Sequence, residues 1–196
     1  MTPPPVDLSE VVRLVEVLRD PLTAEPAGTF PRDTAAAKQP GLYAWWVDED
    51  GLNTLVEQLG MTMPPLIYAG LAGATHWPSG KQSTTTLWSR VRTLHLRGNI
   101  RGSTFRQTLA ALLTAPLSLQ IVGPNRLAPA SEQQLSAWMA DHIRVSIQPY
   151  LDRETLGEME QAILTQLDPP FNLDGMAPSE VRRKVAAQRG RLMRPI

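Results

Sequence analysis

The chain has 196 residues, balances 19 Lys and Arg against 19 Asp and Glu, and contains no cysteine. Its length fits one domain, and its neutral charge argues against indiscriminate, tight binding to nucleic acid. The lack of cysteine excludes disulfides, thiolate zinc sites and a cysteine nucleophile.

The sequence gives no sign of a membrane or of export. No window approaches the roughly 18 consecutive apolar residues that a spanning helix needs, so we expect no membrane partner. The first ten residues, MTPPPVDLSE, lack the basic start and apolar stretch of a signal peptide. We therefore expect the protein in the cytoplasm, while a protein partner or a homodimer stays open.

The N-terminal part predicts a helix and then two strands. Apolar residues at helical spacing predict a helix over 8–19, with Ser9 as a candidate cap, before a Pro/Ala-rich connection. LYAWWV predicts a strand that the turn-forming DEDG ends, and PLIYAG predicts a second strand. A short helix that closes on Gly60 lies between them. If the two strands pair antiparallel, they form a sheet with a helical excursion.

The remainder of the chain predicts helices mixed with short strands. A polar loop over 71–86 separates the second strand from a helix that Thr86 would cap. Alternation of Ile143, Val145 and Ile147 with polar residues predicts a half-buried strand. The other predictions are helices over 104–113, 131–142, 152–167 and about 178–188, and a short strand over 118–122. This mixture favours an α+β fold around a small, mostly antiparallel sheet.

Glu160 stands out because it falls inside the apolar stripe of its predicted helix. Leu156, Ile163, Leu164 and Leu167 lie at offsets of −4, +3, +4 and +7 from it. A carboxylate on an inward face is costly unless it is paired or binds a metal. The alternative is a glutamate at the edge of the stripe that reaches solvent or an arginine.

A basic run extends from Arg90 to Arg106 and contains five arginines and no acid. Guanidinium groups, flexible backbone and a capped helix start all suit phosphate oxygens. A solvated basic face is the alternative. Within this run, His95 is a candidate for phosphate contact or proton transfer, whereas the basic C-terminal segment carries a weaker signal.

Tyr43 and Tyr68, each taken alone, are typical of buried strand residues whose hydroxyls are satisfied. Their sequence context changes this interpretation. GLY at 41–43 and YAG at 68–70 are followed in order by Arg90, Glu160 and Asn172, the last in DPPFN and twelve residues after Glu160. In order and spacing, these features resemble the GIY-YIG nuclease family over roughly residues 40 to 175.

The resemblance implies a central three-stranded antiparallel sheet and one-metal hydrolysis of phosphodiesters. Tyr43 would be the general base, and Tyr68 would position the attacking water or the phosphate. Arg90 would stabilise charge on the phosphate, and Glu160 would hold Mg2+ or Mn2+. Asn172 would orient one of the tyrosines or the glutamate.

The sequence thus predicts three parts and a nucleic-acid substrate, with DNA favoured. Residues 1–39 form an N-terminal helix and connection, 40–176 a GIY-YIG-like domain with an enlarged first hairpin and an Arg-rich insert around 90–115, and 177–196 a basic C-terminal helix or tail. His95 joins the catalytic candidates. The expected nucleic-acid contacts are Arg92, Arg97, Arg101, Ser103 and Arg106.

Two other functions stay open. The first is a catalytically weak or silent module that binds nucleic acid within a larger complex. The second is a protein-interaction domain whose tyrosines are core residues and whose Glu160 is salt-bridged to Arg90. A convergence of the Tyr43, Tyr68, Arg90 and Glu160 side chains on one cleft separates the nuclease from this second alternative.

Overall fold

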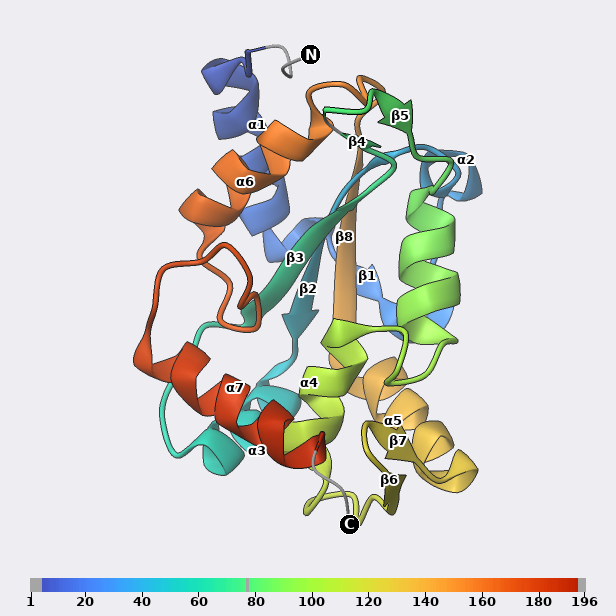
Figure 1. Ribbon diagram of the computed structural model, residues 1–196, viewed down its shortest axis with the longest axis vertical. Helices are drawn as coiled ribbons and strands as arrows, with labels where there is room; N and C mark the ends of the chain where they lie inside the picture. Colours follow the sequence, from blue (N-terminus) through green and yellow to red (C-terminus); the bar gives the residue numbers. More distant parts are fainter. Residues whose placement is uncertain (1–4, 77, 194–196) are drawn as a thin grey trace.

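The computed structural model describes residues 5–76 and 78–193 (Figure 1). Its centre is a four-stranded antiparallel sheet in the order β1-β8-β2-β3. The strands are β1 Glu25–Pro26, β2 Gly41–Val47, β3 Leu66–Ala72 and β8 Ile143–Pro149. The α+β prediction and the three predicted central strands are confirmed, and the two-residue β1 adds a fourth strand beside β8.

Strand β2 is buried on both faces, which fixes the layers of the molecule. Tyr43 and Trp45 face one hydrophobic cluster, whereas Leu42 and Trp46 face another. This follows from the two-residue period of a strand. A bulge in β3 leaves Ile67 as the extra residue between Leu66 and Tyr68, because Trp45 pairs with Tyr68 and Trp46 with Leu66.

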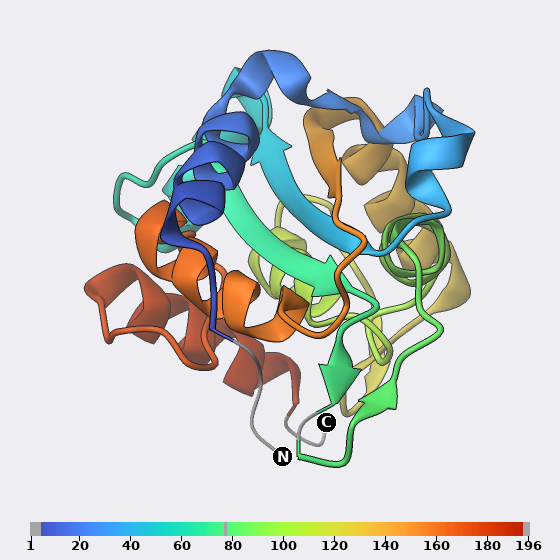
Figure 2. The ribbon, with the colours of Figure 1, turned by 90° about the horizontal axis from the view of Figure 1, so that it is seen from above.

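The helices cover both faces of the sheet (Figure 2). Helices α1 (Leu8–Arg19) and α6 (Leu156–Leu167) pack on one face, with the cluster that holds Leu42. The opposite cluster contains residues of most other helices. These elements are α2 Thr34–Ala37, α3 Glu49–Leu59, η3 Trp88–Leu96, α4 Thr104–Leu113, α5 Pro129–His142 and α7 Glu180–Leu192, with short 3-10 turns η1 Pro21–Thr23 and η2 Ala27–Thr29.

Two small hairpins and the starts of several helices differ from the sequence prediction. Asp7 caps α1 in place of Ser9, and α5 and α6 begin at Pro129 and Leu156, not at 131 and 152. The 71–86 loop contains the hairpin of β4 (Thr75–His76) and β5 (Lys81–Gln82), and β6 (Ile121–Gly123) pairs with β7 (Arg126–Leu127). DEDG begins α3 instead of forming a turn, because Asp48 accepts a hydrogen bond from the Gly51 N–H and caps the helix. None of the helices in the described ranges is long and apolar enough to cross a membrane.

The helix predicted after Thr86 is a π-helix, η3, over Trp88–Leu96. Its hydrogen bonds join residues five apart, as from the N–H of Arg97 to the carbonyl of Arg92 (3.0 Å). Residues with a separation of five, such as Arg90 and His95, therefore lie close to the same face.

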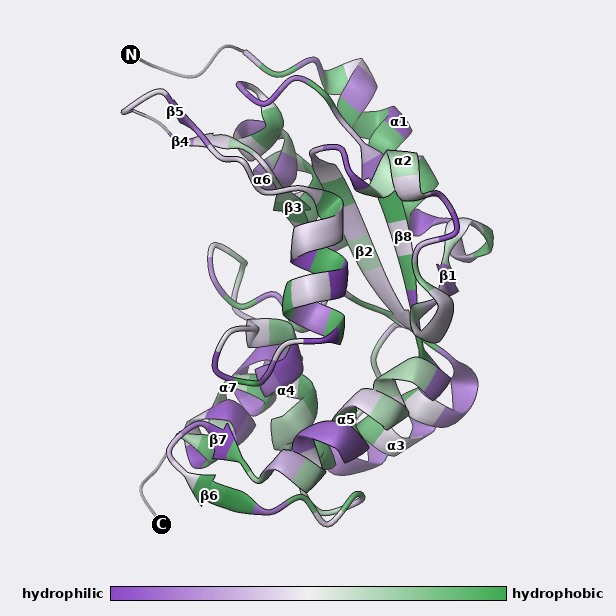
Figure 3. Ribbon diagram, turned by 90° about the vertical axis from the view of Figure 1, so that its right-hand side faces the viewer, coloured by the Kyte–Doolittle hydropathy of each residue, from purple (hydrophilic) through white to green (hydrophobic). Residues whose placement is uncertain are grey.

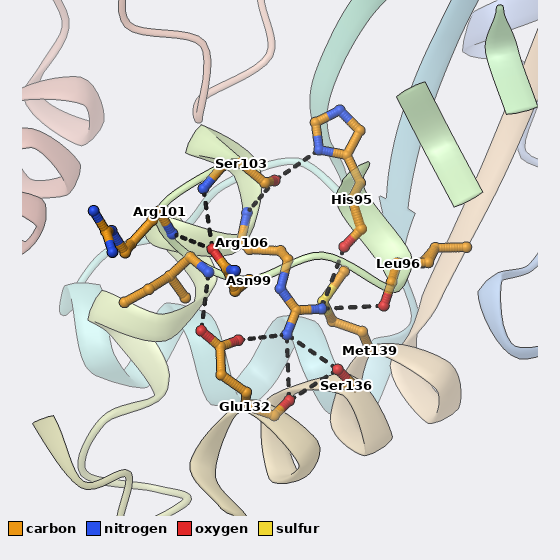
Figure 4. A network of polar contacts seen from close by, with 11 residues as sticks. His95, Leu96, Asn99, Arg101, Ser103, Arg106, Glu132, Ser136 and Met139 are labelled. Carbon is orange, nitrogen blue, oxygen red and sulfur yellow. Dashed lines mark hydrogen bonds and ion pairs between the residues drawn. The ribbon is translucent and has the colours of Figure 1, made fainter. Parts of the chain in front are cut away.

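Arg106 holds the end of η3 against α5 (Figure 4). Its side chain is completely buried, and Nη1 donates to the carbonyls of His95 and Leu96 (3.3 and 3.2 Å). Nη2 forms an ion pair with Glu132 Oε2 (2.8 Å), and Glu132 Oε1 accepts from the Ile100 N–H. The guanidinium thus satisfies carbonyls that the helix end leaves without a partner.

We predict that Arg106→Met lowers the free energy of unfolding by about 3 kcal/mol, because it leaves a partly buried carboxylate and two carbonyls without their donor. Arg101→Met is the matched control, since Arg101 is exposed in the loop just before α4 and its replacement should cost less than about 0.5 kcal/mol. Urea denaturation monitored by circular dichroism measures both variants. Equal losses in the two variants would contradict a structural role for the buried network.

Candidate active site

The outer edge of β3 is where the candidate residues meet. Strand β3 ends the sheet, so its outward backbone groups need partners from elsewhere. Asn172 supplies two of them: its Oδ1 accepts from the Ala69 N–H (3.0 Å) and its Nδ2 donates to the Ala69 carbonyl (2.8 Å). The N–H of Phe171 donates to the carbonyl of Ile67 (2.9 Å). Asn172 therefore acts as a pairing group for the strand that carries Tyr68.

Tyr43 lies at the back of the site, on the inner strand. It pairs across the sheet with Gly70, the glycine of YAG. A Cβ at Gly70 would lie 2.6 Å from the Tyr43 hydroxyl, so only glycine leaves room for the ring in this position. The Tyr43 side chain is buried, with 2% of the residue exposed. Burial raises the pKa of this hydroxyl well above its usual value.

His95 is buried beside Tyr43 and hydrogen-bonded at both ring nitrogens. Its Nε2 lies 2.9 Å from the Tyr43 hydroxyl and its Nδ1 2.7 Å from Ser103 Oγ. Burial, with smaller effects from the positive charges of Arg90 and Arg106, lowers the pKa of His95 to about 3, so the ring is neutral near pH 7.

The partner at Nδ1 decides the tautomer of His95. Ser103 Oγ already accepts from the N–H of Arg106 (3.1 Å), as the N-cap of α4. Within the described ranges, the acceptor for its own proton is His95 Nδ1. We predict that Ser103 Oγ gives its own proton to His95 Nδ1, which puts the His95 proton on Nε2 and directs it at the oxygen of Tyr43.

Tyr68 lines the open part of the site. Its hydroxyl lies 3.4 Å from Thr104 Oγ1 at the start of α4, and its ring is 6.5 Å from that of Tyr43. A cavity of about 220 Å3 is lined by residues of β3, α4, α6, α7 and the segment before α7. These are Tyr68, Thr104, Glu160, Gln161, Leu164, Phe171, Asn172, Leu173, Asp174 and Arg189.

Arg90 faces the same group of residues from η3. Its Nε is buried and has no hydrogen-bond partner among the residues that the structure describes. Burial raises the pKa of Tyr43, Tyr68 and Glu160, and the positive charge of Arg90 opposes that rise in each. A buried donor without a partner is costly, which favours a role in binding a ligand.

Glu160 completes the group from α6, where it is half-buried as its position in the apolar stripe suggested. Burial raises the pKa of its carboxyl to about 7, while the charge of Arg90 and a backbone hydrogen bond from Leu71 act in the opposite direction. The ion pairs of the described residues do not include one between Glu160 and Arg90. The interaction-domain alternative, which needed that salt bridge, loses its main support.

The predicted catalytic residues thus come together, but they do not all reach the cavity. Tyr68, Glu160 and Asn172 line it, whereas Tyr43 and Arg90 do not. Two of the four side chains whose convergence separates the nuclease from the interaction domain therefore reach the cavity, and the other two lie behind it. Asn172 uses both ends of its amide on the backbone of Ala69, so it positions β3 instead of bonding directly to a tyrosine hydroxyl or to Glu160.

The predicted nucleic-acid contacts divide into exposed and internal residues. Arg97 and Arg101 are exposed. Arg92 is half-buried, donates to the Phe30 carbonyl and stacks over Trp88. Ser103 and Arg106 are buried in the interactions described above. Burial contradicts a direct contact of these last two side chains with nucleic acid, and we withdraw that prediction for them.

Sequence reasoning missed Arg189, which lines the cavity from α7. The basic C-terminal segment was visible in the sequence, but nothing in its spacing separates Arg189 from its basic neighbours. Helix α7 packs on α4 (Figure 1). This packing brings Arg189 to the cavity.

Two tyrosines on neighbouring strands of an antiparallel sheet, with an arginine and a glutamate beside them, agree with the resemblance that the sequence shows. A family model described as the GIY-YIG catalytic domain matches residues 41–191, and the chain belongs to this family. The sequence-based resemblance is confirmed, and membership implies a nuclease-type activity on nucleic acid in general. Searches of curated proteins and of solved structures returned no match.

We predict that Glu160→Gln stabilises the metal-free protein at alkaline pH. Because folding raises the pKa of Glu160 from 4.5 to about 7, the folded state binds more protons in that window and stability falls as pH rises through it. The variant should gain about 2 kcal/mol at pH 8 and almost nothing at pH 4. Urea denaturation with a chelator present measures this gain.

Glu158→Gln is the matched control for this test, because Glu158 is exposed on the same helix. Its effect should be small at both pH values. A Glu160→Gln gain that does not depend on pH would show that the carboxyl is not strained by burial.

We also predict that His95 stays neutral between pH 5 and 8 with its proton on Nε2. Nitrogen-15 NMR of the imidazole rings distinguishes the two tautomers and the charged form. The exposed His76 provides an internal reference in the same spectra. A proton on Nδ1, or a titration of His95 near pH 6.5, would contradict the hydrogen-bond accounting.

Proposed function

We propose that the protein is a metal-dependent endonuclease that hydrolyses phosphodiester bonds in DNA. The observation that carries this proposal is the arrangement of Arg90 and Glu160. A guanidinium with a partnerless buried donor and a carboxylate with a raised pKa act on the same two tyrosines without forming an ion pair. A phosphodiester and a cation would satisfy both charges at once.

Tyr43 is the proposed general base, taking a proton from the attacking water. A base must be the phenolate, and burial disfavours that form. The charge of Arg90 opposes this effect, and in the predicted tautomer the N–H of His95 Nε2, 2.9 Å from the Tyr43 oxygen, does so too. His95 is thus proposed to stabilise negative charge on Tyr43, and Ser103 to hold the tautomer that does so.

Tyr68 and Arg90 are proposed to act on the phosphate. The Tyr68 hydroxyl lies at the cavity, where it can position the water or a phosphate oxygen. The guanidinium of Arg90 would bind the oxygens that gain negative charge, which is the largest single effect in many such reactions. Its buried Nε would then obtain an acceptor.

Glu160 is the proposed ligand of one divalent cation, Mg2+ or Mn2+. The described residues include no group of three or more acidic or histidine side chains that could enclose a metal. One carboxylate at a cavity suits Mg2+, which keeps several waters and is commonly bound through one or two carboxylates and substrate phosphates. When bound, such a cation supplies positive charge that stabilises the leaving oxygen.

Contacts outside the site are proposed for Arg97 and Arg101. Both are exposed in the loop between η3 and α4, close to the start of the helix that carries Thr104. Contacts of this kind to phosphates fix the register of a nucleic acid without reading its bases.

One observation favours a second candidate, a catalytically silent module that binds nucleic acid. Tyr43 is almost completely buried and is separated from the cavity, so an attacking water needs space that the described conformation does not provide. The endonuclease and the silent module would bind nucleic acid with the same surface, and only the endonuclease would cleave it.

Cleavage of supercoiled plasmid separates the two candidates. With Mg2+ or Mn2+, we expect the wild type to nick or linearise the plasmid. Tyr43→Phe and Glu160→Ala should each lower the rate at least 100-fold, because one removes the base and the other the metal ligand. Tyr150→Phe and Glu158→Ala are matched controls outside the site and should retain the activity.

Binding of plasmid without cleavage by the wild type would favour the silent module. Equal cleavage by the wild type, Tyr43→Phe and Glu160→Ala would overturn the mechanism.

A further inference from the structure

The cavity beside Glu160 is lined by an arginine other than Arg90, namely Arg189 on α7. Helix α7 is strongly hydrophilic (Figure 3), yet its basic residues have different surroundings. Arg182 is buried, pairs with Asp168 (2.6 Å) and donates to three backbone carbonyls. Arg191 is exposed and donates to Gln188. Arg189 is the one of these three that lines the cavity with Tyr68 and Glu160.

A neutral side chain holds Arg189 in place. Its Nε and Nη2 donate to Gln107 Oε1 (3.1 and 2.8 Å). Gln107 is buried, and its Nε2 donates to Asn125 Oδ1 (2.7 Å), which fixes the amide with its oxygen toward Arg189. Gln107 therefore orients the guanidinium without cancelling its charge.

The charge of Arg189 also has no acidic partner at contact distance within the described ranges. Glu160 and Asp174 both line the cavity, but neither forms an ion pair with it. Two hydrogen bonds to Gln107 occupy two of the five N–H groups of a guanidinium. A half-buried cation held this way retains donors for an anion that enters the cavity.

The positive charges of Arg90 and Arg189 both act on the hydroxyl of Tyr68. Its pKa is raised mainly by burial, and a hydrogen bond with Thr104 and the charges of Arg90 and Arg189 oppose that shift. Arg90 comes from η3 and Arg189 from α7, so positive charge reaches this hydroxyl from two separate elements.

We propose that Arg189 binds a phosphate of the substrate next to the one that is cleaved. This inference rests on the proposed function and extends it, because a chain of phosphates can occupy both guanidinium groups, whereas a single phosphate monoester needs one. Arg189 is thereby assigned to substrate binding, with Gln107 as its positioning residue.

The test compares Arg189→Gln with Arg191→Gln, two charge-removing changes two residues apart on one helix. Fluorescence anisotropy with a 20-base-pair DNA duplex and a chelator gives Kd over a series of NaCl concentrations. Loss of one phosphate contact should weaken binding about tenfold. It should also make the slope of log K against log salt shallower by about 0.9. Arg191→Gln should resemble the wild type in both quantities.

Cleavage kinetics with Mg2+ provide the second measurement. Arg189→Gln should raise KM about tenfold and change kcat by less than about threefold, because a neighbouring phosphate is bound in the ground state and the transition state alike. Arg189→Lys guards against a folding defect, since it keeps the charge: recovery of the salt slope supports the contact, and a loss equal to that of Arg189→Gln overturns it.

The possible failures are distinguishable. If the wild type neither binds nor cleaves DNA, the proposed function is wrong and this inference is wrong with it. If the wild type cleaves DNA while Arg189→Gln and Arg191→Gln give the same Kd and salt slope, the inference alone is overturned.

Discussion

The pairing of the Asn172 amide with the backbone of Ala69 is the interaction on which the site depends. An edge strand exposes a row of donors and acceptors, and an unpaired edge is open to other chains. Here the edge of β3 is closed by a side chain, by the Phe171 backbone and by Glu160, which bonds to Leu71. Closing the edge in this way places the carboxylate of Glu160 and the side chain of Tyr68 at one cavity. The same contacts therefore close the edge of the sheet and form the site.

The electrostatics of the site oppose the charges that its proposed chemistry requires. Burial holds His95 neutral, so stability is lost as pH falls below the ordinary histidine pKa of 6.5. Burial also favours the protonated form of Glu160, so stability is lost as pH rises from 4.5 toward 7. Arg90 adds a buried donor without a partner. A ligand that carries both a cation and phosphate oxygens would stabilise Glu160 and Arg90 together. The cation would pair with the carboxylate of Glu160, and the phosphate oxygens would accept from the guanidinium of Arg90.

Sequence reasoning located the residues whose positions follow from local periodicity. Glu160 could be placed because four apolar residues define the face of its helix. The tyrosines, each typical of a buried strand residue when taken alone, became candidates through the order of the features that carry the family resemblance. The same reasoning could not separate Arg101, which is exposed, from Arg106, which is buried. Both belong to one basic run, and only the packing of α5 supplies the carboxylate that accepts Arg106 in the interior. Arg189 was not predicted as a site residue for the same reason, since the residues around it belong to α4 and β3.

The π-helix shows how spacing and geometry can be reconciled. In an α-helix, five residues turn the chain by about 140° beyond a full turn, so His95 and Arg90 would point to different sides. The i to i+5 hydrogen bonds of η3 bring both toward the sheet. Arg106 then holds the end of this segment through the carbonyls of His95 and Leu96. Arg106 thus acts on Tyr43 indirectly, because it fixes the backbone of His95, whose side chain contacts the Tyr43 hydroxyl.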